Sequence, residues 1–119
     1  MKNFKGLKVW QKGCQIAVNC CNLSYSFPGH EKYGLSLQIS RAGVSIPSNI
    51  AEGSSRTSDK DYGRYLEISL GSCFEAETQL LIAKELKMGN ADIINETLDL
   101  LCEEEKMLTA CCRSLKAKS

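Results

Sequence analysis

Hydrophobic residues recur at steps of three or four positions along most of the chain, which is the periodicity of an α-helix. The pattern is interrupted by Phe27-Pro28-Gly29, by the polar run 54–57 and by Gly89. No stretch alternates as a β-strand does, and no internal repeat occurs. The pattern therefore predicts four helices, at about residues 4–25, 30–52, 59–88 and 91–116.

Residues typical of helix ends stand near these boundaries. Asn3 is expected to cap the first helix, and Gly53 to end the second in a left-handed conformation. Ser58 followed by Asp61 resembles a capping box for the third helix, and Asn90 is suited to cap the fourth. Because the connections are short, neighbouring helices must be antiparallel. The expected fold is a single all-α domain over residues 1–119, an antiparallel up-down-up-down four-helix bundle.

Each helix has a side on which its apolar residues gather. The expected inner side of the first helix carries Leu7, Trp10, Cys14, Ala17 and Cys21. The corresponding residues of the second helix are Leu35, Ile39, Ala42, Ile46 and Ile50. In the fourth helix the apolar seam repeats every seven residues, at Ile94, Leu101, Leu108 and Leu115.

Composition narrows the functional classes. The 119 residues are 43% hydrophobic and 24% charged with a net charge of +1, as in an ordinary globular domain. No segment has the unbroken apolar character of a membrane span or a secretory signal. We therefore expect a cytoplasmic protein without membrane partners.

The seven cysteines do not form a metal-binding or disulfide pattern. None stands in a C-x-x-C spacing, and the single histidine, His30, lies in an expected loop. Cys14, Cys21 and Cys112 fall at helix-core spacing, where a free thiol acts as a small hydrophobic group. We expect no metal and no cofactor.

Catalytic residues are also not apparent. A base, a nucleophile and an orienting group within reach are needed for acid–base or nucleophilic chemistry, and the sequence offers no such set. Glu103-Glu104-Glu105 is interpreted as a solvated run, although Glu105 falls on the apolar seam. The chain is therefore not expected to be an enzyme.

The second helix carries a polar stripe beside its apolar side. The stripe consists of Gln38, Arg41, Ser45, Asn49 and Glu52, with Glu75 expected beside it on the third helix. The antiparallel register predicts Ala42–Gly43 opposite Gly71–Ser72, and Arg41 within about one turn of Glu67 or Glu75. The stripe is suited to contact another helix, another subunit or a ligand, and these alternatives stay open.

Two segments, QISRAGVSIPSNIAEGSSR and YGRYLEISLGSCFEAETQL, resemble a family of small bacterial four-helix bundle proteins. These proteins are encoded in intervening sequences of large-subunit ribosomal RNA genes. The Phe4–Leu7–Trp10 opening and the turn around Phe27-Pro28 fit the same pattern. The pattern marks Arg41, Ser45, Asn49, Glu52, Gly53, Arg56, Gly71, Ser72 and Glu75 in this chain.

The resemblance implies a homopentamer around a central channel, with no catalytic role for the marked residues. Relatives include accessory proteins of diversity-generating retroelements, which bind nucleic acid and a reverse transcriptase. Those relatives are strongly basic, whereas this chain carries a net charge of +1.

Basic residues are nevertheless gathered at one end of the expected bundle. The candidates for contacting nucleic-acid phosphates there are Lys5, Lys8, Lys12, Arg56, Lys60, Arg64 and Arg113. RNA or DNA would be recognised through backbone and shape, since no motif with exposed stacking aromatics is present. The alternative function is an oligomeric scaffold for a protein partner, such as a reverse transcriptase, without nucleic-acid binding.

Overall fold

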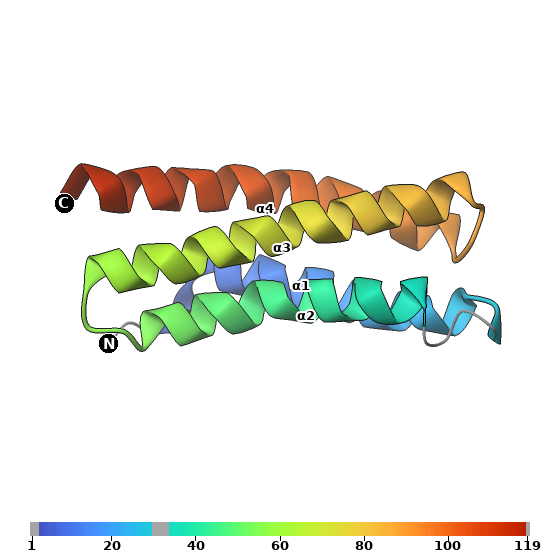
Figure 1. The fold of residues 1–119 in the computed structure, drawn as a ribbon, viewed down its shortest axis with the longest axis horizontal. Coiled ribbons are helices and arrows are strands. Elements are labelled where there is room, and N and C mark those ends of the chain that lie inside the picture. The colour runs from blue at the N-terminus through green and yellow to red at the C-terminus, as the bar shows by residue number, and fades with distance from the viewer. Residues whose placement is uncertain (1–2, 30–33, 119) are drawn as a thin grey trace.

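The computed structural model describes residues 3–29 and 34–118. The chain forms a rod of 46 × 20 × 20 Å from four long helices (Figure 1). They are α1 (Lys8–Leu23), α2 (Leu35–Ser54), α3 (Asp59–Glu85) and α4 (Ala91–Lys118). Two short 3-10 turns, η1 (Phe4–Gly6) and η2 (Ser24–Ser26), flank α1. The predicted all-α, antiparallel four-helix bundle is confirmed.

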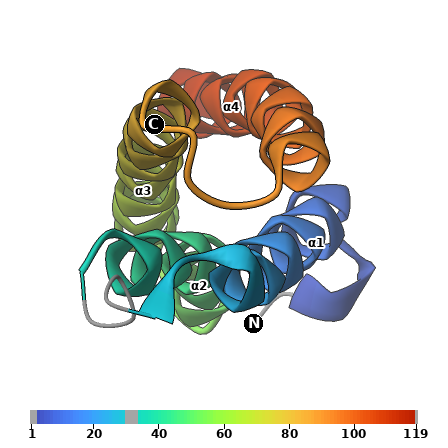
Figure 2. The same ribbon diagram turned by 90° about the vertical axis from the view of Figure 1, so that its right-hand side faces the viewer.

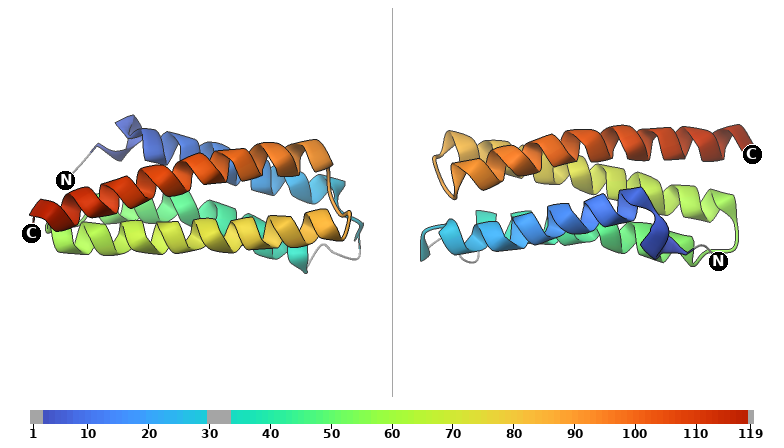
Figure 3. Two further views of the ribbon diagram at one scale, coloured as in Figure 1. Left: turned by 90° about the horizontal axis from the view of Figure 1, so that it is seen from above. Right: turned by 180° about the vertical axis from the view of Figure 1, so that it is seen from behind.

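Seen end-on, the four helices occupy the corners of a square (Figure 2). Close backbone approaches join α1 to α2, α2 to α3, α3 to α4 and α4 to α1, but not the diagonal pairs of helices. The start of α1 and the end of α4 lie at the same end of the rod, which is also the end that holds the α2–α3 loop (Figures 1 and 3). This topology brings residues far apart in sequence to one rim.

The apolar side of α2 is the one that the sequence predicted. Ile39, Ala42, Ile46 and Ile50 are all buried, and Leu35 is half-buried. In α4, Ile94, Leu101 and Leu108 are buried as predicted, while Leu115 is half-buried at the end of the seam. Leucine and isoleucine at helical spacing thus locate the core contacts of these two helices.

On the predicted inner side of α1 Ala17 is buried, and Leu7 and Trp10 are partly buried against the core, but Cys14 and Cys21 are only half-buried. The buried residues are Val9, Gly13, Ile16, Ala17, Asn19, Cys20 and Leu23. The helix is rotated by about one residue, or about 100°, from the predicted orientation. The reason lies in α2, because Gly43 leaves room for Cys20 and a Cβ at Gly43 would lie 2.7 Å from the Cβ of Cys20.

Helix ends differ from the prediction in three places. Asn3 does not cap α1, which begins one turn later because the backbone of Leu7 is extended and the Asn3 side chain makes no capping bond. Gly53 is not a left-handed cap but lies buried inside α2, where an added Cβ would be 2.7 Å from the Tyr65 Cβ. The predicted start of α2 at residue 30 lies outside the described residues, which have α2 beginning at Leu35.

The end of α3 is the third difference. The helix ends at Glu85, ahead of the predicted Met88, in a Schellman motif. The Met88 N–H donates to the Ala83 carbonyl at 2.9 Å and the Lys87 N–H to the Lys84 carbonyl at 3.1 Å. Lys87 therefore takes the left-handed conformation, with φ 57°. The predicted N-terminal caps of α3 and α4 are confirmed. Ser58 Oγ accepts a hydrogen bond from the Asp61 N–H, and Asn90 Oδ1 accepts one from the Ile93 N–H.

Candidate nucleic-acid interface

The basic residues predicted to gather do share one end of the rod. The starts of α1 and α3, the α2–α3 loop and the end of α4 meet there (Figure 1). Five of the seven predicted phosphate-binding candidates have exposed side chains and no carboxylate partner within the described ranges: Lys5, Lys8, Lys60, Arg64 and Arg113. We call these five residues the basic rim.

Two other cations at this end are held by acidic neighbours. Lys12 Nζ lies 3.1 Å from Glu103 Oε1 between α1 and α4, and only 24% of its side chain is exposed. Lys116 Nζ lies 3.5 Å from Glu67 Oε1 between α4 and α3. Lys12 was predicted to belong to the rim, but its ion pair directs it toward α4.

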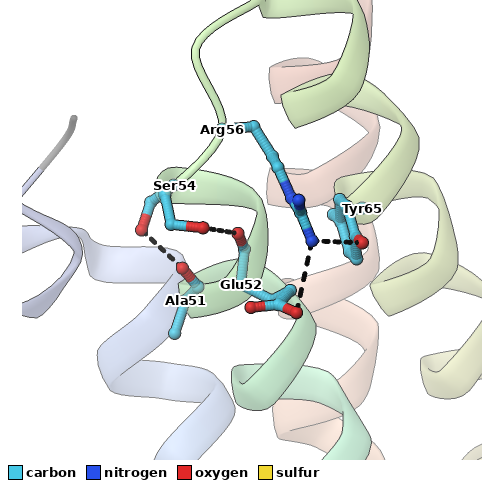
Figure 4. A network of polar contacts seen from close by, with 6 residues as sticks. Ala51, Glu52, Ser54, Arg56 and Tyr65 are labelled. Atoms are coloured by element: carbon cyan, nitrogen blue, oxygen red, sulfur yellow. Dashed lines mark hydrogen bonds and ion pairs between the residues drawn. The ribbon is translucent and has the colours of Figure 1, made fainter.

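Arg56 is positioned by contacts within the chain. Its Nη2 donates to Tyr65 Oη at 2.7 Å and to Glu52 Oε1 at 3.3 Å, and its guanidinium carbon lies 4.8 Å from the centre of the Tyr65 ring (Figure 4). The Arg64 guanidinium carbon lies 5.6 Å from the same ring centre. Tyr65 thus holds two arginines near one another where the α2–α3 loop meets the rim. The sequence pattern marked Arg56 and Glu52 but gave no sign of the tyrosine.

A pocket of about 480 Å³ opens beside the rim between α3 and α4. Lys60, Arg64 and Lys116 line it together with Asp59, Asp61 and Glu67. Its cations and carboxylates are therefore balanced. Two of the pocket's cations, Lys60 and Arg64, belong to the basic rim, while Lys116 is paired with Glu67.

The polar stripe divides into two parts. Ser45 and Asn49 are half-buried and form a network with α3, in which the Ser45 and Ser72 hydroxyls are 2.8 Å apart. Asn49 Nδ2 donates to the Ser45 hydroxyl at 2.9 Å and to the Ser45 carbonyl at 2.8 Å. These residues join α2 to α3, whereas Gln38, Arg41, Glu52 and Glu75 are exposed. The network uses the part of the stripe nearest the helix contact, and the rest is left for solvent or a partner.

The predicted register between α2 and α3 is correct to within about two residues, since Ser69 Oγ donates to the Ile46 carbonyl and Ser72 bonds Ser45, but the predicted contact between small residues is wrong. Gly43 packs against Cys20 of α1, and Gly71 is exposed with no atom within 4 Å of an added Cβ. The close approach of four small residues therefore does not occur. Glu67 is paired with Lys116 instead of Arg41, whose side chain makes no ion pair in the described part of the chain. The Ser45–Ser72 bond fixes the observed register.

The outer side of α3 exposes an apolar surface that sequence reasoning missed. It comprises Ile68, Phe74, Leu81 and Ile82 of α3 and Leu86 directly after its end, each with 44% to 55% of its surface exposed. The opposite side of α3 supplies Leu66, Cys73, Ala76, Leu80 and Ala83 to the core. Since α3 is apolar on both sides, its sequence has only a weak helical asymmetry, which hid this surface. We call it the α3 apolar face.

The sequence did not predict a group of acidic residues in the middle of the bundle, although it placed Glu105 on the apolar seam. Glu104 was interpreted as solvated but is fully buried, and neither carboxylate oxygen has a hydrogen-bond partner. Burial raises its pKa to about 8, and Lys12 opposes this shift. The half-buried Glu105 is hydrogen-bonded to Glu77 of α3, and burial together with this contact raises the Glu105 pKa to about 8.

The seven cysteines are all free thiols. Cys20, Cys73 and Cys112 are buried, whereas the predicted core residues Cys14 and Cys21 are half-buried because α1 is rotated. Burial raises the pKa of the Cys20 thiol to about 12 and that of Cys73 further. No group of three or more metal-ligating side chains occurs in the described ranges. None of the described helices is long and apolar enough to cross a membrane.

Comparisons with known proteins agree with this architecture. A family model described as 23S rRNA-intervening sequence protein matches residues 5–110. A solved structure from Bacteroides thetaiotaomicron, described as a protein with unknown function from the S23 ribosomal protein family, is 26% identical to this chain with a TM-score of 0.80. The match covers 87% of this chain and 97% of that one. No curated protein matches the chain.

Proposed function

Because the chain belongs to the family of 23S rRNA-intervening sequence proteins, we propose that it is a non-enzymatic, homo-oligomeric bundle that binds nucleic-acid phosphates through the basic rim. The observation that carries this proposal is the set of five exposed, unpaired cations at one end of the described rod. Cations without a carboxylate partner are free to replace the counterions of a phosphate backbone. The free thiols favour a cytoplasmic protein.

The rim favours RNA or DNA over a small anion because its cations are spread over three helices. Lys8 stands on α1, Lys60 and Arg64 on α3, and Arg113 on α4. Such a spread suits successive phosphates of one strand better than a single bound group. Recognition would follow backbone and shape, because Tyr65 is covered by Arg56 and is not free to stack on a base.

Charge reversal on the rim tests this function. The double variant Lys8→Glu/Arg64→Glu is compared with Lys84→Glu/Lys106→Glu, which makes the same charge change on exposed residues outside the rim. Fluorescence anisotropy with a labelled mixed RNA pool, measured over a salt series, gives the affinity and its salt slope. We expect the rim variant to lose affinity and to reduce the slope by about two, while the control keeps most of both. Equal affinity and slope in the two variants would contradict the proposal.

The homopentamer implied by the family resemblance is proposed to form through the α3 apolar face. Five large apolar side chains exposed along one helix and directly after its end are more than scattered surface residues, and they favour burial against another protein. The exposed stripe residues Gln38, Arg41 and Glu75 lie on the adjoining surfaces of α2 and α3 and supply polar contacts at its margin.

The variant Phe74→Lys tests this surface, with Val18→Lys as a control that places the same charge at an exposed apolar site of α1. Light-scattering mass should fall toward the monomer for Phe74→Lys and stay oligomeric for Val18→Lys. An unchanged mass for Phe74→Lys would place the interface elsewhere.

The α3 apolar face also favours a second function, a scaffold for a protein partner such as a reverse transcriptase. In that case the same face binds the partner and the rim serves solubility. A scaffold complex held by apolar burial would tolerate salt, whereas a nucleic-acid complex would weaken steeply as salt rises. Salt dependence therefore separates the two functions.

A further inference from the structure

The middle of α4 buries the carboxyl group of Glu104 where no described group forms a hydrogen bond with it. Glu104 is 0% exposed, and neither of its side-chain oxygens has a hydrogen-bond partner. Its Oε2 faces the backbone of α1, since a Cβ added to Gly13 would lie 3.0 Å from it. An ionised carboxylate in such a place would lose its hydration without compensation. The packed state of α4 therefore requires the neutral acid.

The groups around Glu104 come from all four helices. Lys12 and Cys14 of α1, Cys73 of α3 and Cys111 of α4 interact electrostatically with it. From α2, the apolar atoms of Ile46 and Pro47 close the site beside Gly13. Among these described neighbours the one cation is Lys12, and its ammonium is already bound to Glu103 at 3.1 Å.

A second acidic contact lies one residue further along α4. Glu105 and Glu77 are joined by a side-chain hydrogen bond between α4 and α3. Two carboxyl groups can share such a bond only if one of them holds a proton. Glu105 Oε2 is itself buried without a partner. Adjacent residues of α4 thus make one protonated contact toward α1 and another toward α3.

We propose that these contacts form a proton-operated latch: protonated Glu104 lets the middle of α4 pack on α1, and its ionisation releases this part of α4 from the bundle. The Glu105–Glu77 pair acts in the same direction, because loss of the shared proton places two negative charges side by side. Lys12 limits the opening as a counter-charge, because its ammonium can leave Glu103 and pair with the ionised carboxylate of the adjacent residue, Glu104.

The pH range of the latch follows from the direction of the shift. The pKa of Glu104 in the folded chain is raised from 4.5 to about 8. The latch is therefore fully closed below about pH 4.5, weakens as pH rises and levels off above about pH 8, where folded and open forms bind the proton equally little. Across this interval the opening constant changes by up to about tenfold per pH unit for one proton.

Hydrogen–deuterium exchange of the intact protein tests the proposal. We would measure the protection of peptides from α4 relative to those from α2 between about pH 6 and about pH 9, so that the intrinsic pH dependence of exchange cancels. The ratio should fall by up to about tenfold per pH unit to about pH 8 and then level off. In Glu104→Gln the ratio should fall less steeply, by the part that the Glu105–Glu77 pair contributes. In the matched control Asp99→Asn, an exposed site on the same helix, it should follow the wild type.

A second pair of variants keeps the test decisive if Glu104→Gln does not fold. Lys12→Gln removes the counter-charge and should steepen the loss of α4 protection, whereas Glu103→Gln frees Lys12 for Glu104 and should lessen it. A wild-type ratio that does not change with pH would overturn the latch. The same would follow from an unchanged pH dependence in Glu104→Gln, or from equal behaviour of Lys12→Gln and Glu103→Gln.

Discussion

At the residue scale, the structure assigns different tasks to glycines that look alike in the sequence. Gly43 and Gly71 both lie inside long helices and were expected to face one another. Gly43 instead admits Cys20 of α1, with an added Cβ only 2.7 Å from the Cys20 Cβ, while Gly71 is exposed with open space around it. The same substitution should therefore have opposite effects at the two positions.

We predict that Gly43→Ala lowers the free energy of unfolding by about 1–3 kcal/mol, because α1 and α2 must move apart to admit the methyl group. Gly71→Ala is the matched control and should raise it by up to about 1 kcal/mol, since alanine favours the helix and meets no neighbour. Urea denaturation of the two variants measures both changes. A stabilised Gly43→Ala protein would show that the α1–α2 contact is looser than the geometry indicates.

Individual side chains also limit what the sequence can predict. Ile39, Ala42, Ile46 and Ile50 were located correctly because α2 has polar residues on either side of them. Glu104 was not, since a glutamate in an acidic run normally faces solvent. Its burial depends on the missing side chain of Gly13 on another helix, a contact that no local pattern encodes.

At the element scale, helix ends are where local chemistry and packing compete. Ser58 and Asn90 cap α3 and α4 as predicted because the capping bond is local to the chain. The rotation of α1 was not predictable from its own sequence, because its cysteine, alanine and valine residues are spread over several sides of the helix. Packing against α2 decides which of these sides is buried. Helix α3 ends before the predicted Met88 because Lys87 adopts a left-handed backbone conformation.

Lys87 gives a prediction for this element. With φ 57° it occupies the Schellman position that favours glycine, so Lys87→Gly should raise the free energy of unfolding by about 1 kcal/mol. Lys84→Gly, three residues earlier within α3, should lower it by a similar amount through loss of helix propensity. Thermal and urea denaturation provide the comparison. Destabilisation by both substitutions would show that the Lys87 side chain contributes more than its backbone strain costs.

At the scale of the whole molecule, the bundle combines an exposed basic end with a buried acidic middle. The near-neutral net charge of +1 hides this separation. Chain order and antiparallel topology placed the rim correctly, since only the direction of each helix was needed. The buried acids required three-dimensional packing. We expect the rim to make nucleic-acid binding depend on salt and the buried acids to make stability depend on pH.

The acidic middle predicts a pH profile for global stability. Because the pKa of Glu104 is raised to about 8 in the folded state, the folded chain retains a proton that the unfolded chain has lost, and stability must fall as pH rises. The expected slope is up to about 1.4 kcal/mol per pH unit between about pH 4.5 and about pH 8 for this proton. In Glu104→Gln, urea denaturation should show a flatter profile and a larger free energy of unfolding at about pH 8. A parallel profile in the variant would contradict the assignment.

The central claim is that an oligomer of this bundle binds nucleic acid through its basic rim. Light-scattering mass, with and without a mixed RNA pool at low and at moderate salt, tests both parts together. The account predicts an oligomeric mass that increases with RNA at low salt and returns to the protein-only value at moderate salt. A mass that RNA leaves unchanged at both salt concentrations would contradict nucleic-acid binding, and a monomeric mass would contradict the assembly.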